Sequence, residues 1–486
     1  MKHKWITMSL ETKSREYHSR LLLAYHLVRK GYGVIITNNI FNLRYTNRYP
    51  RGLYIIINAF HKYHKPIKYI KKKKNCIYLL DEEGLLYISN ATYKKRIHYD
   101  NISLIDKVLC WGKNQYKTLL SLYPEYEYKY TITGNPRINL LNSKFSNLYI
   151  SKNNNTDIYN PYILIVSNFA NVNRYIYLDN NEKQYGYLLE KAYQLNLVNS
   201  EEEEKIFLER YIFSYNIFKS MKNMILSLSK MYKNINFVIR PHPSEEDTLW
   251  KELEKKSKNI HIIYEGAVTQ WINGAEMIIQ NSCTSSIESL FLNKYCISYR
   301  PYTSIIHEQP LPKVITQNAY STEEVEKAIS LLQEGDKTNY YGKYVKLINN
   351  YVSYYKEDES VKNIVNLIEK ENLESIKYNK RIYYIKSLYI TNIIRNITRI
   401  TIILTANIMH KIMKKLNCVN NNVFILIDKK VDIRKKNKIM SNKKLGYISI
   451  KNSAEILKKY KLVYGDDINI KIEKVDRSTL IITLKE

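Results

Sequence analysis

The sequence contains few of the residues that crosslink or interrupt a chain. Only 5 of its 486 residues are Cys, and none of these forms a CxxC pair. We therefore expect neither a disulfide framework nor a zinc site, and a reducing cytoplasm is the simplest setting. With 13 Gly and 10 Pro, the chain is neither a collagen nor a low-complexity linker. A hydrophobic fraction of 45% and a charged fraction of 25% exclude a wholly disordered protein.

Long apolar runs are also missing. No stretch of 18 or more apolar residues occurs, so no membrane-spanning helix is expected. The first 16 residues are interrupted by charge and contain no apolar signal core. The expected location is the cytoplasm, with peripheral attachment to the inner face of the cell membrane as an option.

Acidic residues are outnumbered by basic ones. There are 46 Asp and Glu against 76 Lys and Arg, which gives a formal net charge of +30. Such a field favours nucleic acid, acidic membranes or phosphorylated substrates as partners. An AT-rich genome would also enrich Lys, and it would explain the 46 Tyr, so the positive charge does not by itself require an anionic partner. Because no nucleic-acid-binding module or clustered aromatic and basic motif is visible, nucleic acid is not an expected partner.

A regular alternation of short apolar runs and helical patterns fills most of the chain. Residues 53–57 and 76–80 have strand character, and a second series begins at 162–166 after an Asn-rich stretch. Strands separated by helices predict parallel sheets. We expect an α/β protein with two Rossmann-like, doubly wound domains, at 1–150 and 160–372. Such a pair binds its ligand between the domains, at the carboxyl ends of the strands.

The composition changes beyond residue 375. Residues 375–427 contain nine Lys or Arg and no Asp or Glu. Residues 375–420 predict a basic amphipathic helical segment that either lies on an anionic membrane surface or packs on the protein body. Residues 421–486 predict a small α+β appendage. Its strand-like runs and its helix are expected at 423–427, 446–450, 468–472, 480–484 and 454–461.

The first group of candidate site residues is an acidic run after a predicted strand. Asp81, Glu82 and Glu83 are followed by Gly84. Carboxylates at a strand end would face the cleft, where one can act as a general base on an acceptor hydroxyl. Adjacent like charges also raise the pKa of one member. A solvated acidic turn is the alternative interpretation.

A second group follows the strand-like run 236–239. Arg240, His242 and Ser244 stand in the sequence RPHPS, where two prolines restrict the backbone around the histidine. A histidine fixed at a strand end can bond a phosphate or assist the departure of a phosphate leaving group, and the arginine can pair with the same anion. A structural turn is the alternative.

A third group occupies residues 281–288, between a predicted strand and a predicted helix. Hydroxyls and unpaired backbone N–H groups at a helix start form an anion site, although a simple helix cap has the same composition. The candidate nucleotide- or phosphate-binding residues are Asn281, Thr284, Ser285, Ser286 and Glu288. Nothing in the sequence activates Cys283 as a nucleophile.

Other polar residues are expected at the edge of the cleft, where they would contact an acceptor or a nucleotide. They are Glu11, Arg15, Glu16, Asn135, Arg137, Asn168 and Asn173. Packing roles are the alternative for each of them. The sequence has no Walker loop, no GxSxG elbow and no DxD-type metal site, so no metal is expected.

Several motifs, in the same order, resemble those of bacterial surface carbohydrate biosynthesis proteins. They are DEEG (81–84), TGNPR (133–137), RPHPSE (240–245) and NSCTSSIES (281–289), and ETKSRE (11–16), Arg51-Gly52 and Trp111-Gly112 also fit. The resemblance covers residues 4–305. It implies a glycosyltransferase of the GT-B type, with two Rossmann-like domains.

Three of these motifs also resemble those of bacterial sialyltransferases and Kdo transferases. Those enzymes have an acidic pair followed by Gly, an HP motif and a Ser-Ser motif. The resemblance implies that one of Asp81, Glu82 and Glu83 is the catalytic base. It implies that His242 contacts the donor phosphate, and that Ser285 and Ser286 hold the phosphate of a CMP-linked sugar.

These features together predict a glycosyltransferase of surface polysaccharide or lipopolysaccharide synthesis. The donor would be a CMP-activated nonulosonic or ulosonic acid, transferred with inversion to a glycan or lipid-linked acceptor, without a metal or a further cofactor. One alternative is a CDP-polyol phosphotransferase of the teichoic-acid type. Another is a non-catalytic protein of polysaccharide assembly.

Overall fold

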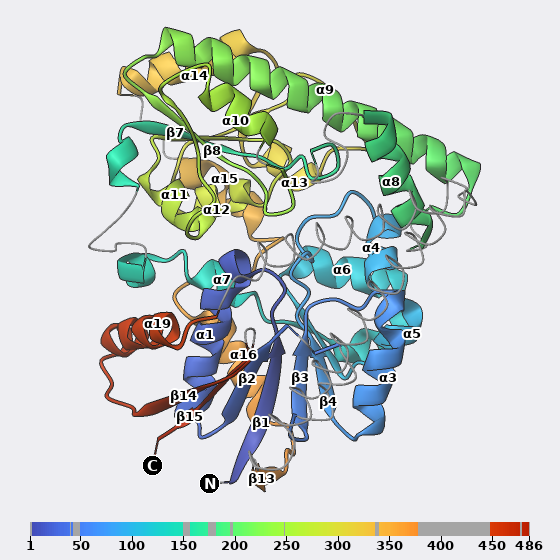
Figure 1. Cartoon of the computed structure of the whole chain (residues 1–486). Coiled ribbons are helices and arrows are strands. Elements are labelled where there is room, and N and C mark those ends of the chain that lie inside the picture. Colours follow the sequence, from blue (N-terminus) through green and yellow to red (C-terminus); the bar gives the residue numbers. More distant parts are fainter. Residues whose placement is uncertain are drawn as a thin grey trace, which may run out of the picture.

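The computed structural model describes most of the chain. The described residues are 2–38, 40–41, 49–148, 156–173, 181–194, 198–246, 248–335, 340–377, 448–476 and 479–485. They form two α/β domains, each built on a largely parallel sheet with helices on both faces (Figure 1). The predicted fold class, two Rossmann-like domains, is confirmed.

The first sheet carries the N-terminal domain. Its strand order is β14-β15-β2-β1-β3-β4-β5-β6. The parallel strands are β1 (Lys2–Ser9), β2 (Gly33–Thr37), β3 (Gly52–Ile56), β4 (Cys76–Leu79), β5 (Lys107–Cys110) and β6 (Tyr130–Ile132). Because β2 and β3 lie on either side of β1, the strand order reverses there, and the loops beyond the carboxyl ends of the strands open toward the second domain (Figure 1).

Helices cover both faces of this sheet. They are α1 (Lys13–Arg29), α3 (His64–Lys72), α4 (Asn90–Arg96), α5 (Tyr99–Ile102), α6 (Lys113–Leu122) and α7 (Pro136–Asn139). Leu21 and Val28 of α1 are buried against one face, and Ile67 and Ile70 of α3 are buried against the other. The strands are buried on both faces, which explains why they are nearly continuous Val, Ile and Leu runs.

The second sheet has the order β12-β11-β10-β7-β8-β9. Its strands are β7 (Tyr162–Val166), β8 (Asn236–Arg240), β9 (Ile260–Ile262), β10 (Met277–Gln280), β11 (Cys296–Tyr299) and β12 (Gln317–Ala319). Its helices are α8 (Asn181–Gln194), α9 (Glu201–Met231), α10 (Thr248–Glu254), α11 (Val268–Gly274), α12 (Ser285–Phe291), α13 (Pro310–Val314), α14 (Thr322–Gln333) and α15 (Tyr340–Ile348). The strand order reverses at β7, so the loops after β7, β8 and β10 lie side by side.

The chain returns to the first domain after α15. Helix α16 (Glu359–Glu369) packs on α1, because Val361, Ile364 and Ile368 join the same buried cluster as the apolar residues of α1. Strand β13 (Ser375–Lys377) then pairs antiparallel with the start of β1. The last helix of the predicted second domain, 160–372, therefore belongs by its contacts to the first domain.

The C-terminal residues extend the first sheet. Helix α19 (Ile450–Tyr464) packs on α1, and strands β14 (Ile470–Asp476) and β15 (Thr479–Leu484) form a hairpin whose β15 pairs antiparallel with β2. Figure 1 shows these red elements directly beside the blue ones. The predicted α+β character is present, but the strands complete an existing sheet and do not form a separate unit, because Leu480 and Ile482 are buried against the N-terminal core.

Two C-terminal predictions have other outcomes. The predicted strand at 446–450 is wrong in its last residues, because Ser449 accepts a hydrogen bond from the N–H of Asn452 and starts α19 at Ile450. The predicted strand at 423–427 and the predicted basic helical segment from residue 378 on lie outside the described residues. The helical prediction is wrong for residues 375–377, which form strand β13 because they pair with the start of β1. Among the described residues, no helix is both long enough and apolar enough to cross a membrane.

Apolar contacts join the two domains. Leu85, Trp111 and Ile138 of the first domain belong to one buried cluster with Ile287 and Leu311 of the second. The polar groups described next border the same contact, because Leu85, Trp111, Ile138 and Ile287 line one pocket with Glu82, Arg137 and Glu288.

Candidate active site

The acidic loop directly follows β4. Asp81 and Glu82 are buried, whereas the side chain of Glu83 is 35% exposed. The N–H of Gly84 donates to the carbonyl of Asp81 at 3.3 Å. A Cβ atom on Gly84 would lie 2.3 Å from Nε2 of Gln115, so a larger residue would push this side chain away from its hydrogen bonds to Trp111 and Tyr93.

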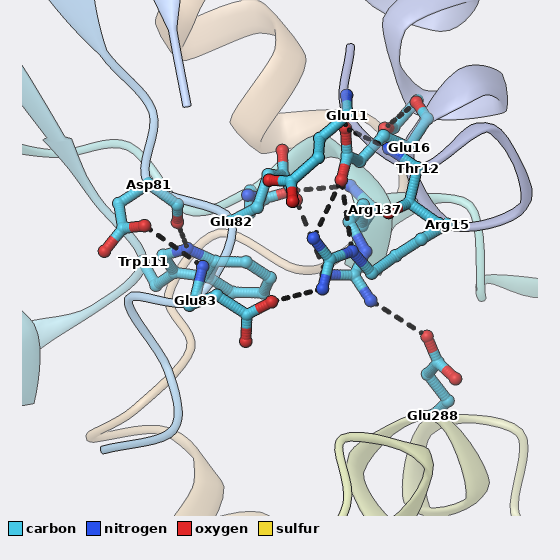
Figure 2. Close-up of polar contacts among 12 residues, drawn as sticks. Glu11, Thr12, Arg15, Glu16, Asp81, Glu82, Glu83, Trp111, Arg137 and Glu288 are labelled. Atoms are coloured by element: carbon cyan, nitrogen blue, oxygen red, sulfur yellow. Dashed lines mark hydrogen bonds and ion pairs between the residues drawn. The ribbon is translucent and has the colours of Figure 1, made fainter. Parts of the chain in front are cut away.

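Asp81 is turned away from the arginines that hold its two neighbours (Figure 2). Its Oδ1 accepts a hydrogen bond from Nε of Arg96 at 2.6 Å, and its backbone carbonyl accepts one from Nε1 of Trp111 at 2.6 Å. Within the described part of the chain, the buried Oδ2 has no hydrogen-bond partner. Burial raises the pKa of Asp81, and the nearby Arg96 only partly offsets this.

Glu82 is held as a buried anion. Its Oε1 accepts from Nη2 of Arg20 at 2.6 Å, and its Oε2 lies 3.4 Å from Nη1 of Arg137. Burial alone would raise the pKa of Glu82, but Arg20, Arg137 and Arg15 together lower it. Because Arg20 is itself fully buried on α1, this pair joins the acidic loop to the first helix.

Glu83 pairs with Arg15, which also binds Glu16. Nε and Nη2 of Arg15 donate to Oε1 of Glu16 at 3.1 and 2.9 Å, while Nη1 contacts Glu83 (Figure 2). Although burial opposes ionisation of Glu83, Arg15 and Arg96 lower its pKa to about 2. Glu83 is therefore an anion at neutral pH.

Glu16 organises the start of α1. Its Oε2 accepts the backbone N–H groups of Glu11 and Thr12 at 2.7 and 3.3 Å, which ties the turn before the helix to its first turn. Burial raises the pKa of Glu16, with Arg15 opposing the shift. Glu16 therefore positions the β1–α1 turn and the guanidinium of Arg15.

The Gly-Asn-Pro-Arg turn after β6 presents another arginine. Gly134 has a φ of +74°, and Oδ1 of Asn135 accepts the N–H of Arg137 at 2.9 Å to cap α7. The guanidinium of Arg137 lies 5.7 Å from the Trp111 ring centroid. This turn thus fixes the position of Arg137 between the acidic loop and the second domain.

An ion pair crosses the cleft at this point. Nη2 of Arg137 donates to Oε1 of Glu288, on α12, at 3.1 Å (Figure 2). Burial raises the pKa of Glu288, against the effect of Arg137. A small pocket here is lined by side chains of both domains, among them Glu82, Glu83, Arg137, Thr284 and Glu288.

The histidine of the second domain has a defined tautomer. His242 follows β8, and its Nδ1 accepts the backbone N–H of Ser244 at 3.1 Å. A neutral imidazole whose Nδ1 accepts a hydrogen bond carries its proton on Nε2. The ring, which is half-buried between Pro241 and Pro243, can therefore act as a hydrogen-bond donor through Nε2.

Glu245 holds the second-domain loops together, and the sequence reasoning missed it. Its fully buried carboxylate accepts the N–H of Phe169 at 2.8 Å, the indole of Trp250 at 2.9 Å and the N–H of His242 at 3.3 Å. Ser167 and Asn173 also donate to it. Burial raises the pKa of Glu245, since the hydrogen bonds offset it only in part.

Glu245 lies in the loop after β8, because α10 begins only at Thr248. The carboxylate is used by the loops, and the only sequence signal was its place at the end of RPHPSE. Asn173 is fully buried, and its amide also donates to the carbonyl of Glu246 at 3.0 Å. Asn173 therefore links the loop after β7 to the histidine loop after β8.

Arg240 is occupied by backbone carbonyls. Its Nη1 donates to the carbonyl of Glu265 at 2.6 Å, and its Nη2 contacts those of Tyr264 and Gly266. Burial lowers the pKa of Arg240 to about 10, with Glu288 opposing the shift. In this conformation the guanidinium holds the β9–α11 turn, and it would have to leave these carbonyls to pair with a phosphate. The predicted pairing with a phosphate stays a prediction.

The hydroxyls at the start of α12 differ in their contacts. The Ser286 hydroxyl donates to the carbonyl of Cys283 at 2.7 Å. The buried Ser285 hydroxyl has no hydrogen-bond partner among the described residues. Thr284 lines the pocket between the domains. Thr284 is thus the hydroxyl of this group that a ligand in the pocket could contact, whereas Ser285 is buried.

The remaining candidates lie around these loops. The amide of Asn168 is exposed and donates to the carbonyl of Ser282 at 3.4 Å, which links the loops after β7 and β10. Asn281 donates to the carbonyl of Tyr299 at 2.8 Å, a contact within the second sheet. Ser244 is buried in the histidine loop.

The structure thus brings Arg15, Glu82, Glu83, Arg137 and Glu288 into one connected group. Asp81 and Asn281 point into their own domains. The sequence reasoning missed Arg20, Arg96 and Glu245, which hold the candidate acids and the histidine loop. Arg20 and Arg96 lie inside helices, where the pattern alone gives no sign of a buried partner.

No protein-family profile matches the chain, and no curated protein matches its sequence. Solved structures with a similar fold include UDP-GlcNAc 2-epimerase from Neisseria meningitidis, with 14% identity and a TM-score of 0.48 over 76% of this chain and 100% of that chain. The enzyme of the same name from Methanocaldococcus jannaschii shares 15% identity, with a TM-score of 0.46 over 76% of this chain and 100% of that chain. The wall teichoic acid polymerase TagF shares 10%, with a TM-score of 0.47 over 76% of this chain and 88% of that chain. The likeness concerns the fold, and it carries no conclusion about the substrate.

Proposed function

We propose that this protein is a glycosyltransferase of surface polysaccharide or lipopolysaccharide synthesis. The observation that carries the proposal is the connected group across the cleft. Arg137 joins the acidic loop of the first domain to α12 of the second, and a pocket with side chains of both domains lies beside the partly exposed Glu83. Loops at the carboxyl ends of parallel strands, at a domain interface, are the usual place for a ligand, and here they would receive the acceptor from one domain and the nucleotide-sugar from the other.

Glu83 is the member of the acidic run that we assign as general base. A base must reach the acceptor hydroxyl, and Asp81 and Glu82 are buried. Glu82 also accepts from the buried Arg20, so its carboxylate is committed to the fold. Glu83 is ionised in the resting state, and an acceptor hydroxyl that replaces Arg15 as its partner would raise its proton affinity.

His242 is the group that we assign to the leaving phosphate. Because Nδ1 of His242 accepts a hydrogen bond from the N–H of Ser244, the ring proton is on Nε2, and this N–H is the group that would donate to the phosphate. In the proposed reaction the acceptor oxygen forms a bond to the anomeric carbon as its proton passes to Glu83. The bond from the anomeric carbon to the phosphate oxygen breaks, and His242 donates to the departing nucleotide. The donor is a CMP-activated nonulosonic or ulosonic acid, a choice that rests on the resemblance of the three motifs.

The lining of a second pocket indicates which kind of acceptor would fit. It shares Leu85 and Leu86 with the first pocket and continues between the two domains along Tyr87, Asn114 and Tyr351. Its lining contains amide and hydroxyl groups and no charged side chain. Such a surface suits a neutral glycan better than a polyol-phosphate polymer, whose repeated negative charges would require cations.

The experiment is a product analysis with the purified full-length chain, a neutral oligosaccharide acceptor, and either a CMP-activated nonulosonic acid or a CDP-polyol. Release of CMP with a glycosidic product supports the proposal. A product containing a phosphodiester would establish the teichoic-acid-type phosphotransferase instead. If a folded protein binds glycan but produces neither product, the protein is a non-catalytic assembly component.

A further inference from the structure

Three metal-ligating side chains meet on the first domain, away from the acidic loop. They are His61 in the turn after β3, His98 before α5, and Asp100 within α5. Nδ1 of His61 lies 3.4 Å from Nδ1 of His98 and 3.7 Å from Oδ2 of Asp100, and the last two atoms are 3.6 Å apart. The same three atoms therefore form a nearly regular triangle.

The dimensions of this triangle match one class of ion. An ion placed just above the plane of these atoms, as tetrahedral geometry requires, would lie about 2.2 Å from each, which is close to typical Zn–N and Zn–O distances. Two ligands of a tetrahedral zinc ion are about 3.4 Å apart at those typical distances. Neighbouring ligands of an octahedral Mg²⁺ are only about 3.0 Å apart, and Ca²⁺ binds longer, all-oxygen sets. Two imidazoles and one carboxylate are also ligands that zinc accepts.

The backbone already holds these ligands in place. Ala59 and Ile97 form a parallel bridge, and the N–H of His98 donates to the carbonyl of Ala59 at 3.0 Å. The amide of Asn101, which is fully buried, donates to the carbonyls of Ala59 and Phe60 at 3.0 and 2.7 Å. The two segments that carry the ligands are thus joined without the ion. Binding would require Nδ1 of His98 to exchange its 3.4 Å contact with the backbone N–H of Asp100 for the ion.

We propose that His61, His98 and Asp100 form a Zn²⁺ site with a fourth position open to water. The side chains are 57%, 36% and 47% exposed, so an ion can enter from solvent. The sequence gives no zinc motif because His61 and His98 are 37 residues apart and meet only through the β3 and α4–α5 connections. This inference does not depend on the proposed nucleotide-sugar chemistry.

The ion would also fix a segment next to the candidate active site. Phe60 precedes His61, and the guanidinium of Arg96 lies 5.2 Å from the Phe60 ring centroid. Arg96 in turn holds Asp81 at 2.6 Å. Zinc would therefore join the segment that carries Phe60 and His61 to the segment that follows Arg96, the residue that bonds Asp81. Its role would be structural, because it would stabilise the folded chain.

The test uses the untagged full-length protein, freed of metal by a chelator. Titration with Co²⁺, followed by visible absorption, should give the spectrum of a tetrahedral site at one equivalent, and Zn²⁺ should displace it. Zn²⁺ should also raise the melting temperature. His61→Ala and Asp100→Asn should each weaken Zn²⁺ binding by about tenfold or more. Because all three ligands are surface groups, these variants should fold.

The matched control is His261→Gln, a histidine of the second domain that bonds Asn236 and has no role in the triangle. It should bind Zn²⁺ as the wild type does. The proposal is overturned if the protein shows no saturable Co²⁺ or Zn²⁺ binding. It is equally overturned if a folded His61→Ala/His98→Ala double variant binds Zn²⁺ with unchanged affinity.

Discussion

Arg137 of the first domain donates a hydrogen bond to Glu288 of the second at 3.1 Å, and its other Nη atom lies 3.4 Å from Glu82. The pair is almost completely buried, so a charge left alone there would be expensive. A single guanidinium thus connects the acidic loop to the helix that the sequence associates with phosphate binding.

The first prediction concerns this connection. Arg137→Met should reduce turnover by about tenfold or more, because the two walls of the cleft lose their shared partner. It should also destabilise the protein by about 3–5 kcal/mol, because Glu288 is left buried without its partner. Arg137→Met/Glu288→Gln should recover part of the stability, which chemical denaturation measures. No recovery in the double variant would contradict the coupling.

Substitutions of Glu83 and Glu82 should have different effects on activity and on stability. Glu83→Gln should reduce turnover by about 10²–10⁴-fold while stability changes by less than about 1 kcal/mol, because the side chain is partly exposed. Glu82→Gln should instead destabilise the chain by about 3–5 kcal/mol, because Arg20 would be buried without an anion. The measurements are kcat and urea unfolding on the same preparations. Full activity of Glu83→Gln would exclude it as the base.

The pH dependence of stability should also single out Glu82. Its pKa is lower in the folded chain than the ordinary value of 4.5, because Arg20, Arg137 and Arg15 outweigh the effect of burial. Its contribution is therefore fully present above pH 4.5 and is lost as the pH falls further. The difference in unfolding free energy between wild type and Glu82→Gln should shrink below that pH. Glu245→Gln should show the opposite trend, since burial raises the pKa of Glu245.

The C-terminal hairpin should be part of the core. Ile482 of β15 is fully buried beside β2, and Ile482→Ala should cost about 2–4 kcal/mol in unfolding free energy. The control is Lys485→Ala, an exposed residue just beyond β15, which should change stability by less than about 0.5 kcal/mol. Equal effects of the two substitutions in urea unfolding would show that the hairpin does not stabilise the first domain.

The sequence predicted the strands well because they are buried on both faces. Runs such as Tyr162–Val166 and Met277–Gln280 are short and almost wholly apolar, which is typical of strands covered on both faces. The strand-end location of Glu83, His242 and Thr284 followed from the same pattern, since loops at the carboxyl edge of a parallel sheet carry the polar groups.

Long-range partners could not be predicted. Arg20 meets Glu82 across 62 positions, and Arg137 meets Glu288 across 151, so no local pattern encodes either pair. The return of β15 to the edge of β2 is hidden for the same reason: an amphipathic hairpin does not reveal which open sheet edge it will cover. The triangle of His61, His98 and Asp100 likewise depends on the fold.

The most direct test of the central claim is calorimetric titration of the folded protein with CMP, CDP, UDP and GDP, repeated on His242→Ala. Our account predicts selective CMP binding, weakened in His242→Ala and unchanged in His261→Gln. Preference for CDP would favour the polyol phosphotransferase, and preference for UDP or GDP would reject the CMP-sugar donor. Absence of binding to any nucleotide would contradict the proposed function.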